Sequence, residues 1–284
     1  MTLTWRDALA DAKAQLGPQR SHEARWLVER ASGHEGADFL LFLDDAPATR
    51  HLAFFDEMLL RRVAGEPLQY VLGRWAFRTL DLLVDRRVLI PRPETEIVAG
   101  LAIEALSRFP PATRLAADLG TGSGAIGLAI AAEVAAARVW LTDRSDDALA
   151  VARANLAGLG GRAATRVNVA GGSWFGALPP SLVGSLAVVV SNPPYIAATT
   201  DLPAEVTDWE PAAALYAGSA GTDDLRHLIA NASDWLAPAG SLILELSPEQ
   251  AGAMAELATR VGFAEVAVVA DLAGRDRALV ARRA

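Results

Sequence analysis

The chain has 284 residues, of which 52% are hydrophobic and 21% are charged, and its formal net charge is −8. This composition is typical of a folded protein with one large domain or two smaller ones. The chain has no cysteine, which excludes disulfides, thiolate catalysis and cysteine-ligated zinc. Its four histidines show no metal-ligand spacing, so we expect no metal centre. The acidic charge argues against a nucleic-acid substrate, because proteins that bind phosphate backbones usually carry a basic surface.

The beginning of the chain has charges at helical spacing and lacks the apolar centre of a signal peptide. No run of about 18 apolar residues without charges follows it, so we expect no membrane span. We therefore expect a cytoplasmic protein, and we take a monomer as the expected state.

Residues 4–64 have the periodicity of several short amphipathic helices and no strand signal. Thr4 is placed to cap the first helix, which Gly17 and Pro18 should end, and Ser21 is placed to cap the second. A short segment from Asp38 to Leu43 and a helix from Ala48 to Ala64 complete this region. The sequence thus predicts a helical bundle over residues 1–72.

The following segment, residues 73–92, changes character. Its glycines and prolines interrupt the helical period, and two short runs, Trp75–Leu83 and Asp85–Ile90, favour a β-hairpin linker. Pro93 then suits the first turn of a new helix, which Glu94 and Glu96 would stabilise through their negative charge.

Beyond residue 114, apolar strands alternate with helices. Such near-continuous apolar strands predict a parallel sheet covered by helices on both faces, and hence an α/β domain over residues 93–284. The expected strands are Leu115–Leu119, Arg138–Thr142, Ala163–Val169, Leu186–Ser191, Ser241–Leu246, Ala264–Ala270 and Arg277–Ala281.

A glycine-rich loop follows the first of these strands and leads into a helix. It contains Asp118, Gly120, Thr121, Gly122, Ser123 and Gly124. Glycine lets a backbone approach a ligand closely, and ligands of open α/β sheets bind at the carboxyl ends of strands. A structural turn or a dinucleotide-binding turn remains possible. However, an acid before the loop would repel a pyrophosphate, so we favour a cationic ligand, such as one with an ammonium and a sulfonium.

Asp143 ends the next strand, near the offset of ~20 residues at which an acid binds ribose hydroxyls. Its alternative role is to cap the helix that follows. Together with the glycine loop, this acid favours a bound nucleoside.

A second motif, Asn192-Pro193-Pro194-Tyr195, follows the strand Leu186–Ser191. Two prolines make the backbone rigid and leave its carbonyls free to accept hydrogen bonds. Asn192 adds another acceptor, and Tyr195 adds a flat face for stacking. Such acceptors can hold the two hydrogens of a planar –NH2 group and direct its nitrogen at an electrophilic methyl. A rigid loop with a core tyrosine is the structural alternative.

These motifs resemble those of class I methyltransferases that modify amide or exocyclic amino nitrogens. The wider chain resembles the HemK/PrmC family, the peptide chain release factor glutamine N5-methyltransferases. The segments that carry this resemblance are Glu66–Tyr70, Val88–Glu96, Ser173–Phe175 and Trp209–Pro211. The resemblance implies a Rossmann-like domain with a mostly parallel seven-stranded sheet.

The resemblance also implies a cofactor, S-adenosylmethionine, and a substrate, the glutamine of the Gly-Gly-Gln motif in class I release factors. The helical bundle would help to dock this protein substrate. The cofactor would be bound by Asp118, Gly120, Thr121, Gly122, Ser123, Gly124, Asp143, Trp174 and Asn192. The glutamine would be held by Asn192, Pro193, Pro194 and Tyr195, with Arg92, Pro93 and Glu94 beside it.

Other functions stay open at this point. Trp174 could be a core residue, and the segment Pro91–Glu96 could be only a hinge and helix start. The target could be a glutamine of a ribosomal protein, or an adenine or guanine amino group of a nucleic acid. A nucleotide-binding protein without chemistry, or a dehydrogenase, is the alternative of another class.

Overall fold

The computed structural model describes residues 3–284, which divide into two units. The first unit contains residues 3–74 together with residues 204–209, and the second contains residues 75–203 and 210–284. We expected the bundle at residues 1–72, the first two of which lie outside the described residues, and a separate hairpin linker at 73–92. In the structure most of that linker belongs to the second unit, and the distant segment 204–209 belongs to the first.

The first unit is helical, and its core contains Trp5, Leu27, Phe55 and Met58. Its helices are α1 (Trp5–Arg20), α2 (Glu23–Ser32), α3 (Phe39–Phe42), α4 (Thr49–Val63), α5 (Leu68–Leu72) and α10 (Ala204–Thr207).

Two of the three helix boundaries predicted from single residues in this unit are confirmed and one is wrong. Thr4 caps α1, since its hydroxyl accepts a hydrogen bond from the Asp7 backbone while the Asp7 carboxylate accepts one from the Thr4 backbone. Gly17 takes a non-helical conformation, with a φ of 72° and a ψ of 175°, and interrupts the helix there as predicted, so that α1 consists of two helical pieces joined at a kink. The predicted cap at Ser21 is wrong, because its hydroxyl donates to the Pro18 carbonyl.

A buried arginine joins the two chain segments of this unit. The Arg62 side chain is only 3% exposed and forms ion pairs with Glu23 at 2.5 Å and Glu205 at 3.0 Å. It also donates to the Glu66 carbonyl at 2.9 Å. Because a buried charge is stable only when it is paired, these contacts attach α10 to the bundle.

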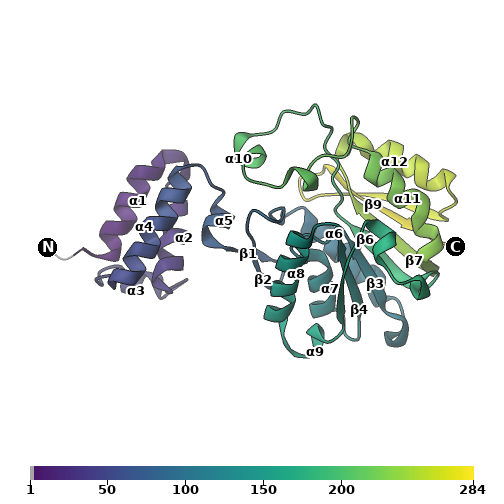
Figure 1. Cartoon of the computed structure of the whole chain (residues 1–284), viewed down its shortest axis with the longest axis horizontal. Helices are drawn as coiled ribbons and strands as arrows, with labels where there is room; N and C mark the ends of the chain where they lie inside the picture. Colours follow the sequence, from purple (N-terminus) through teal and green to yellow (C-terminus); the bar gives the residue numbers. More distant parts are fainter. Residues whose placement is uncertain (1–2) are drawn as a thin grey trace. The chain divides into compact units, whose positions relative to one another are not determined.

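Seven strands of residues 75–284 form one sheet in the order β5-β4-β3-β6-β7-β9-β8, which confirms the expected mostly parallel α/β sheet (Figure 1). Five of them pair in parallel, and β9 pairs antiparallel with both β7 and β8. The strands are β3 (Leu115–Leu119), β4 (Arg138–Asp143), β5 (Val167–Gly171), β6 (Leu186–Ser191), β7 (Leu236–Glu245), β8 (Glu265–Ala270) and β9 (Asp276–Arg282).

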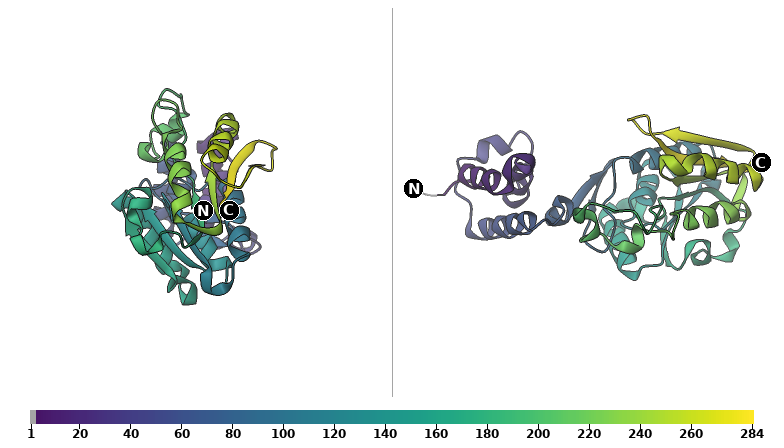
Figure 2. Two further views of the ribbon diagram at one scale, coloured as in Figure 1. Left: turned by 90° about the vertical axis from the view of Figure 1, so that its right-hand side faces the viewer. Right: turned by 90° about the horizontal axis from the view of Figure 1, so that it is seen from above.

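Helices cover both faces of the sheet. One group, α6 to α8, packs on one face and the pair α11 and α12 packs on the other (Figures 1 and 2). The helices of this unit are α6 (Thr95–Ser107), α7 (Ala125–Glu133), α8 (Asp146–Leu159), α9 (Gly161–Ala164), α11 (Asp223–Trp235) and α12 (Pro248–Arg260). Short 3-10 turns occur at Pro111–Thr113, Trp174–Ala177, Pro180–Leu182 and Ala212–Ala214.

The predicted hairpin has the wrong register. Its two strands, β1 (Arg74–Phe77) and β2 (Leu80–Leu83), cover residues 74–83, so both fall almost entirely within the run Trp75–Leu83 that we expected to be a single strand. The chain reverses at Arg78, which takes a left-handed φ of 52° that no sequence signal indicated. The second predicted strand, Asp85–Ile90, is irregular.

Two strand boundaries also differ from the predictions. Residues 163–166 form the end of α9 and a turn, closed by a hydrogen bond from the Arg166 N–H to the Ala163 carbonyl, so β5 begins at Val167. Strand β7 begins at Leu236, before the predicted Ser241. The strand continues through Pro238 and Gly240 because Ala239 takes a left-handed φ and the pairing with β6 shifts its register at this point.

The order of the strands determines where a ligand can bind. The chain runs outward from β3 through β4 to β5 and then returns to form β6 on the other side of β3. Neighbouring loops therefore diverge between the carboxyl ends of β3 and β6, where open α/β sheets bind ligands.

We expect Gly127→Ala to lower the free energy of unfolding by about 1–3 kcal/mol. A Cβ at Gly127, on the face of α7 toward the sheet, would lie 2.1 Å from the Leu141 side chain and 3.1 Å from Asp118. Gly252→Ala is the matched control, because the position lies in α12 with no atom within 4 Å of the added Cβ, and it should raise stability by about 0.5–1 kcal/mol. Equal stability of the two variants in urea denaturation would contradict this packing.

Candidate active site

A cavity lies where the loops after β3 and β6 meet. Its walls include Gly120 to Ser123 from the first loop and Asn192 and Pro194 from the second. The two strands pair in parallel, with Asp118 opposite Val190, and the Ser191 hydroxyl donates to the Leu119 carbonyl at 2.6 Å. Since Ser191 directly precedes Asn192, this bond fixes the two motifs against each other.

Asp118 shapes the glycine loop from beneath. Its Oδ2 accepts hydrogen bonds from the Thr121 hydroxyl at 2.6 Å and from the Gly127 N–H at 2.9 Å. Burial raises the pKa of this carboxyl to about 6, against the opposing effect of these two bonds. Among the described residues, its buried Oδ1 has no hydrogen-bond partner. Asp118 is not among the residues that line the cavity.

Gly120 brings the loop against an aromatic side chain. Its φ is +70°, and an added Cβ would lie 3.2 Å from the Trp174 ring. Trp174 begins a 3-10 turn with a left-handed φ of 48°. Its side chain packs against the hydrophobic core and also lines the cavity, so it has both of the roles that the sequence left open. A glycine is therefore needed at 120 for both its backbone conformation and its close contact.

Asp143, the last residue of β4, also lines the cavity. One carboxylate oxygen accepts from the Gly122 N–H at 3.0 Å and the other from the Ser145 N–H at 2.9 Å. The helix cap itself is Ser145, whose hydroxyl accepts from the Ala148 N–H. Asp143 thus supports the glycine loop and remains exposed to the cavity, where each oxygen keeps a further lone pair.

Asn155 is a loop support that the sequence analysis missed. Its amide nitrogen donates to the Ser123 carbonyl at 2.8 Å and the Leu83 carbonyl at 3.0 Å, while its oxygen accepts from the Leu83 N–H at 2.7 Å. The buried side chain connects α8, the glycine loop and β2. The only feature of the sequence that could have indicated this role is an asparagine on the inner face of a predicted helix.

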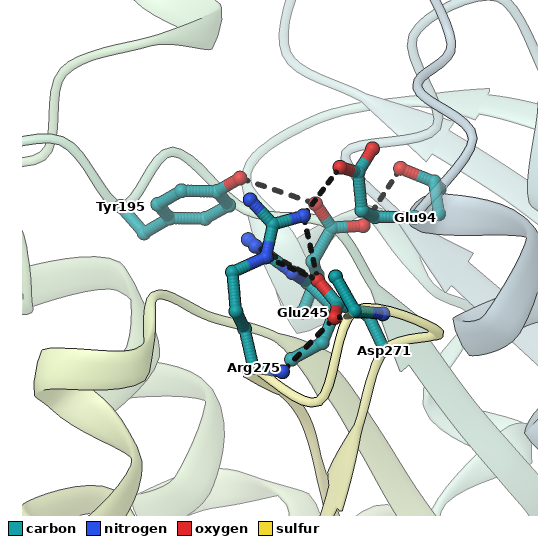
Figure 3. Close-up of polar contacts among 8 residues, drawn as sticks. Glu94, Tyr195, Glu245, Asp271 and Arg275 are labelled. Atoms are coloured by element: carbon teal, nitrogen blue, oxygen red, sulfur yellow. Dashed lines mark hydrogen bonds and ion pairs between the residues drawn. The ribbon is translucent and has the colours of Figure 1, made fainter.

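The Asn-Pro-Pro-Tyr motif divides between the cavity and the core. Asn192 and Pro194 line the cavity, whereas Pro193 and Tyr195 do not. The Asn192 amide nitrogen donates to the Thr95 hydroxyl at 3.2 Å. Tyr195 points toward Glu245, and its hydroxyl donates to that carboxylate at 3.1 Å (Figure 3). Burial raises the pKa of Tyr195, so its phenol stays protonated.

Comparison with known proteins identifies the chain. Residues 5–73 match the PrmC N-terminal domain, and residues 99–208 match the methyltransferase small domain. The chain is 40% identical to a release factor glutamine methyltransferase of Moorella thermoacetica over 99% of both chains. It is 39% identical to one of Cereibacter sphaeroides over 97% of both chains. The chain belongs to the release factor glutamine methyltransferase family. A crystal structure of a methyltransferase from Pyrococcus furiosus, 19% identical, shares the fold with a TM-score of 0.51 over 80% of this chain and 97% of that one.

The segment Val88–Glu96 lines the cavity with some of its residues and supports it with others. The Arg92 guanidinium forms an ion pair with buried Glu210, which also accepts from the Ile90 N–H at 3.1 Å. Glu94 forms an ion pair with Arg275 at 3.0 Å. Of this segment, Arg92, Pro93 and Glu94 do not line the cavity, whereas four residues do: Val88, Leu89, Pro91 and Thr95. Glu210 lies in the segment Trp209–Pro211, which carries part of the resemblance, but no feature of the sequence indicated that Arg92 is its partner.

None of the helices within residues 3–284 combines the length and the apolar composition that a membrane span requires. These residues have no membrane-spanning helix. They also contain no cluster of three or more histidine, aspartate or glutamate side chains placed to hold a metal ion.

The raised pKa of Asp118 predicts how this methyltransferase responds to pH. The folded protein keeps the Asp118 proton up to about pH 6, whereas the unfolded chain releases it near the ordinary value of 3.8. The free energy of unfolding should therefore fall as the pH rises from about 4 to about 6, by up to about 3 kcal/mol from this group.

Asp118→Asn removes this contribution while its amide oxygen can still accept both bonds. The stability of the variant relative to the wild type should therefore increase as the pH rises over that interval. The free energies of unfolding of both proteins can be measured by denaturant titration at pH 4.5, 5.5 and 7. A constant difference between the wild type and the variant would contradict the assignment of this pH dependence to Asp118.

Proposed function

We propose that the protein transfers a methyl group from S-adenosylmethionine to the side-chain nitrogen N5 of a glutamine. The proposed substrate is the Gly-Gly-Gln glutamine of class I peptide chain release factors. The observation that carries the proposal is that Gly120 and Asn192, which directly follow two adjacent parallel strands, line one cavity. A donor on the first loop and an amide on the second would meet there, in a chain of this family.

The residues around the first loop fit the cofactor. Asp143 faces the cavity with free lone pairs for ribose hydroxyls, and Trp174 supplies an apolar wall. Asp118 carries a buried oxygen without a partner among the described residues, and its negative charge suits a cationic ligand. The other proposed cofactor contacts are Gly120, Thr121, Gly122, Ser123, Gly124 and Asn192. When bound, S-adenosylmethionine supplies an electrophilic methyl on a sulfonium, whose sulfur retains the bonding electron pair.

The second loop would hold the substrate amide. The Asn192 side-chain oxygen and a backbone carbonyl of the Pro193-Pro194 pair, of which Pro194 lines the cavity, are the proposed acceptors for the two N–H groups. Tyr195 would keep this backbone rigid. The amide nitrogen lone pair forms the new bond, and one N–H proton leaves for water. A strong base is unnecessary, because that proton becomes acidic only as the bond forms. Positioning then contributes most of the rate enhancement.

The ion pairs described above suggest a supporting role for Arg92, Pro93 and Glu94. Arg92 and Glu94 already have partners in Glu210 and Arg275. We propose that this segment holds Pro91 and Thr95 in the cavity wall and meets the bound release factor only at its exposed atoms.

The bundle is the proposed docking unit for the release factor. Leu40 and Leu41 on α3 are 66% and 77% exposed, and Trp26 on α2 is also exposed. We propose that these side chains contact the release factor, because their burial against a partner would remove apolar surface from water. Because the proposed substrate acts in translation, we place the protein, as a monomer, in the cytoplasm.

An assay with labelled S-adenosylmethionine tests this function. Purified class I release factor should acquire label on the Gly-Gly-Gln glutamine, and a release factor with that glutamine changed to alanine should acquire none. Label that appears instead on ribosomal protein, rRNA or DNA would overturn the proposed substrate.

Asn192→Ala should lower kcat by about 100-fold or more while the affinity for S-adenosylmethionine, measured by calorimetry, stays within about threefold. The variant loses an acceptor for the substrate amide but leaves the glycine loop intact. Asn231→Ala is the matched control, because Asn231 is exposed on α11, where its amide nitrogen donates to the His227 carbonyl within the same helix. An equal loss of both kcat and cofactor affinity in Asn192→Ala would restrict Asn192 to cofactor binding.

A further inference from the structure

A chain of hydrogen bonds runs from the cavity into the core behind Asn192. The Asn192 amide nitrogen donates to the Thr95 hydroxyl, and that hydroxyl donates to Glu245 Oε2 at 2.7 Å. The other Glu245 oxygen accepts from the Tyr195 hydroxyl (Figure 3). Glu245 thus contacts the motif at both of its ends, directly at Tyr195 and through Thr95 at Asn192.

The fold accounts for this arrangement. Glu245 is the last residue of β7, and the preceding Leu244 pairs with Ser191 at the end of β6. Asn192 and Glu245 therefore leave the sheet at the same level on adjacent strands. Thr95 is the first residue of α6, which packs on both of these strands.

The direction of each bond follows from the number of hydrogens available. The Thr95 hydroxyl has one hydrogen, and Glu245, as a carboxylate, can only accept. That hydrogen therefore goes to Glu245, and the Thr95 oxygen faces Asn192 as an acceptor. Asn192 must in turn present its NH2 group to Thr95, which leaves its carbonyl oxygen for another donor.

We propose that Glu245 is a positioning residue that acts through Thr95 to set the orientation of the Asn192 amide. This inference rests on the proposed function. With the Asn192 oxygen facing the substrate, the site accepts the –NH2 end of a glutamine carboxamide. It disfavours the reversed carboxamide and the carboxylate of glutamate, because each would bring an oxygen against an oxygen. Glu245 therefore helps to select nitrogen as the atom that is methylated.

The surroundings of Glu245 are consistent with this role. The residue is 1% exposed, so its two hydroxyl partners are held without competition from bulk water. Burial raises its pKa, which the bonds from Thr95 and Tyr195 and the charge of Arg277 on β9 oppose, while Glu94 before α6 adds to the increase. Figure 3 shows Arg275 between Glu94 and Asp271, and the structure gives it an ion pair with each.

Replacing the Thr95 hydroxyl tests the chain of hydrogen bonds, because this hydroxyl connects Asn192 to Glu245. Thr95→Val keeps the shape but removes the acceptor and donor, and it should lower kcat for release factor methylation by about 10- to 100-fold. The KM for release factor and the affinity for S-adenosylmethionine should stay within about threefold. Thr95→Ser keeps the hydroxyl and should stay within about threefold of the wild type. Thr259→Val, at an exposed site on α12, is the matched control and should leave kcat unchanged.

The pH dependence of kcat tests Glu245 itself. Protonation gives the carboxyl a hydrogen that it must donate to one of its two hydroxyl partners. At saturating concentrations of both substrates, the wild-type kcat should therefore fall as the pH decreases through the Glu245 pKa. Glu245→Gln should have a lower kcat, and its pH profile should lack this decrease on the acidic side (the acidic limb).

The outcomes separate this inference from the proposed function. A wild-type kcat in Thr95→Val, equal losses in the Val and Ser variants, or an unchanged acidic limb in Glu245→Gln would each overturn the positioning role. If the wild-type protein itself produced no methylglutamine, both proposals would fall together. If Glu245→Gln does not fold, the Thr95 pair still decides the question.

Discussion

The parallel pairing of β3 with β6 is the constraint on which the site depends. It places the start of the loop after β3 beside the start of the loop after β6, which is about 70 residues away in the sequence. The bond from Ser191 to the Leu119 carbonyl then fixes this placement at the point where both strands end. A chain that followed the same helices and strands in another order would separate the two motifs, even if each kept its local conformation.

Four carboxylates, of which all but Asp143 are buried, hold the surrounding loops in place. Asp118 and Asp143 organise the glycine loop, Glu210 anchors the Ile90–Arg92 segment within the second unit, and Glu245 holds the hydroxyls of Thr95 and Tyr195. Each carboxylate accepts from backbone or side-chain donors, which compensates part of the cost of its burial. This rigidity suits a reaction in which orientation, rather than a strong base, would lower the barrier.

The sequence predicts those features that arise from local patterns. The apolar runs gave the strands and the parallel sheet, and the glycine loop and the Asn-Pro-Pro-Tyr motif were found by their positions after strands. The hairpin register was missed because it depends on a left-handed Arg78. The partners Thr95, Asn155 and Glu245 were missed because each acts through a contact more than 30 residues away, which no spacing rule describes. Likewise, the attachment of residues 204–209 to the bundle depends on the buried Arg62.

A crystal structure of the protein with S-adenosylhomocysteine would test the central claim most directly. The account predicts that the ribose lies beside Asp143 and that the sulfur faces the Asn192 side chain across the cavity. It also predicts that the Asn192 nitrogen remains bonded to Thr95. A ligand bound elsewhere, or a sulfur directed away from Asn192, would contradict the claim that the two strand ends form one site.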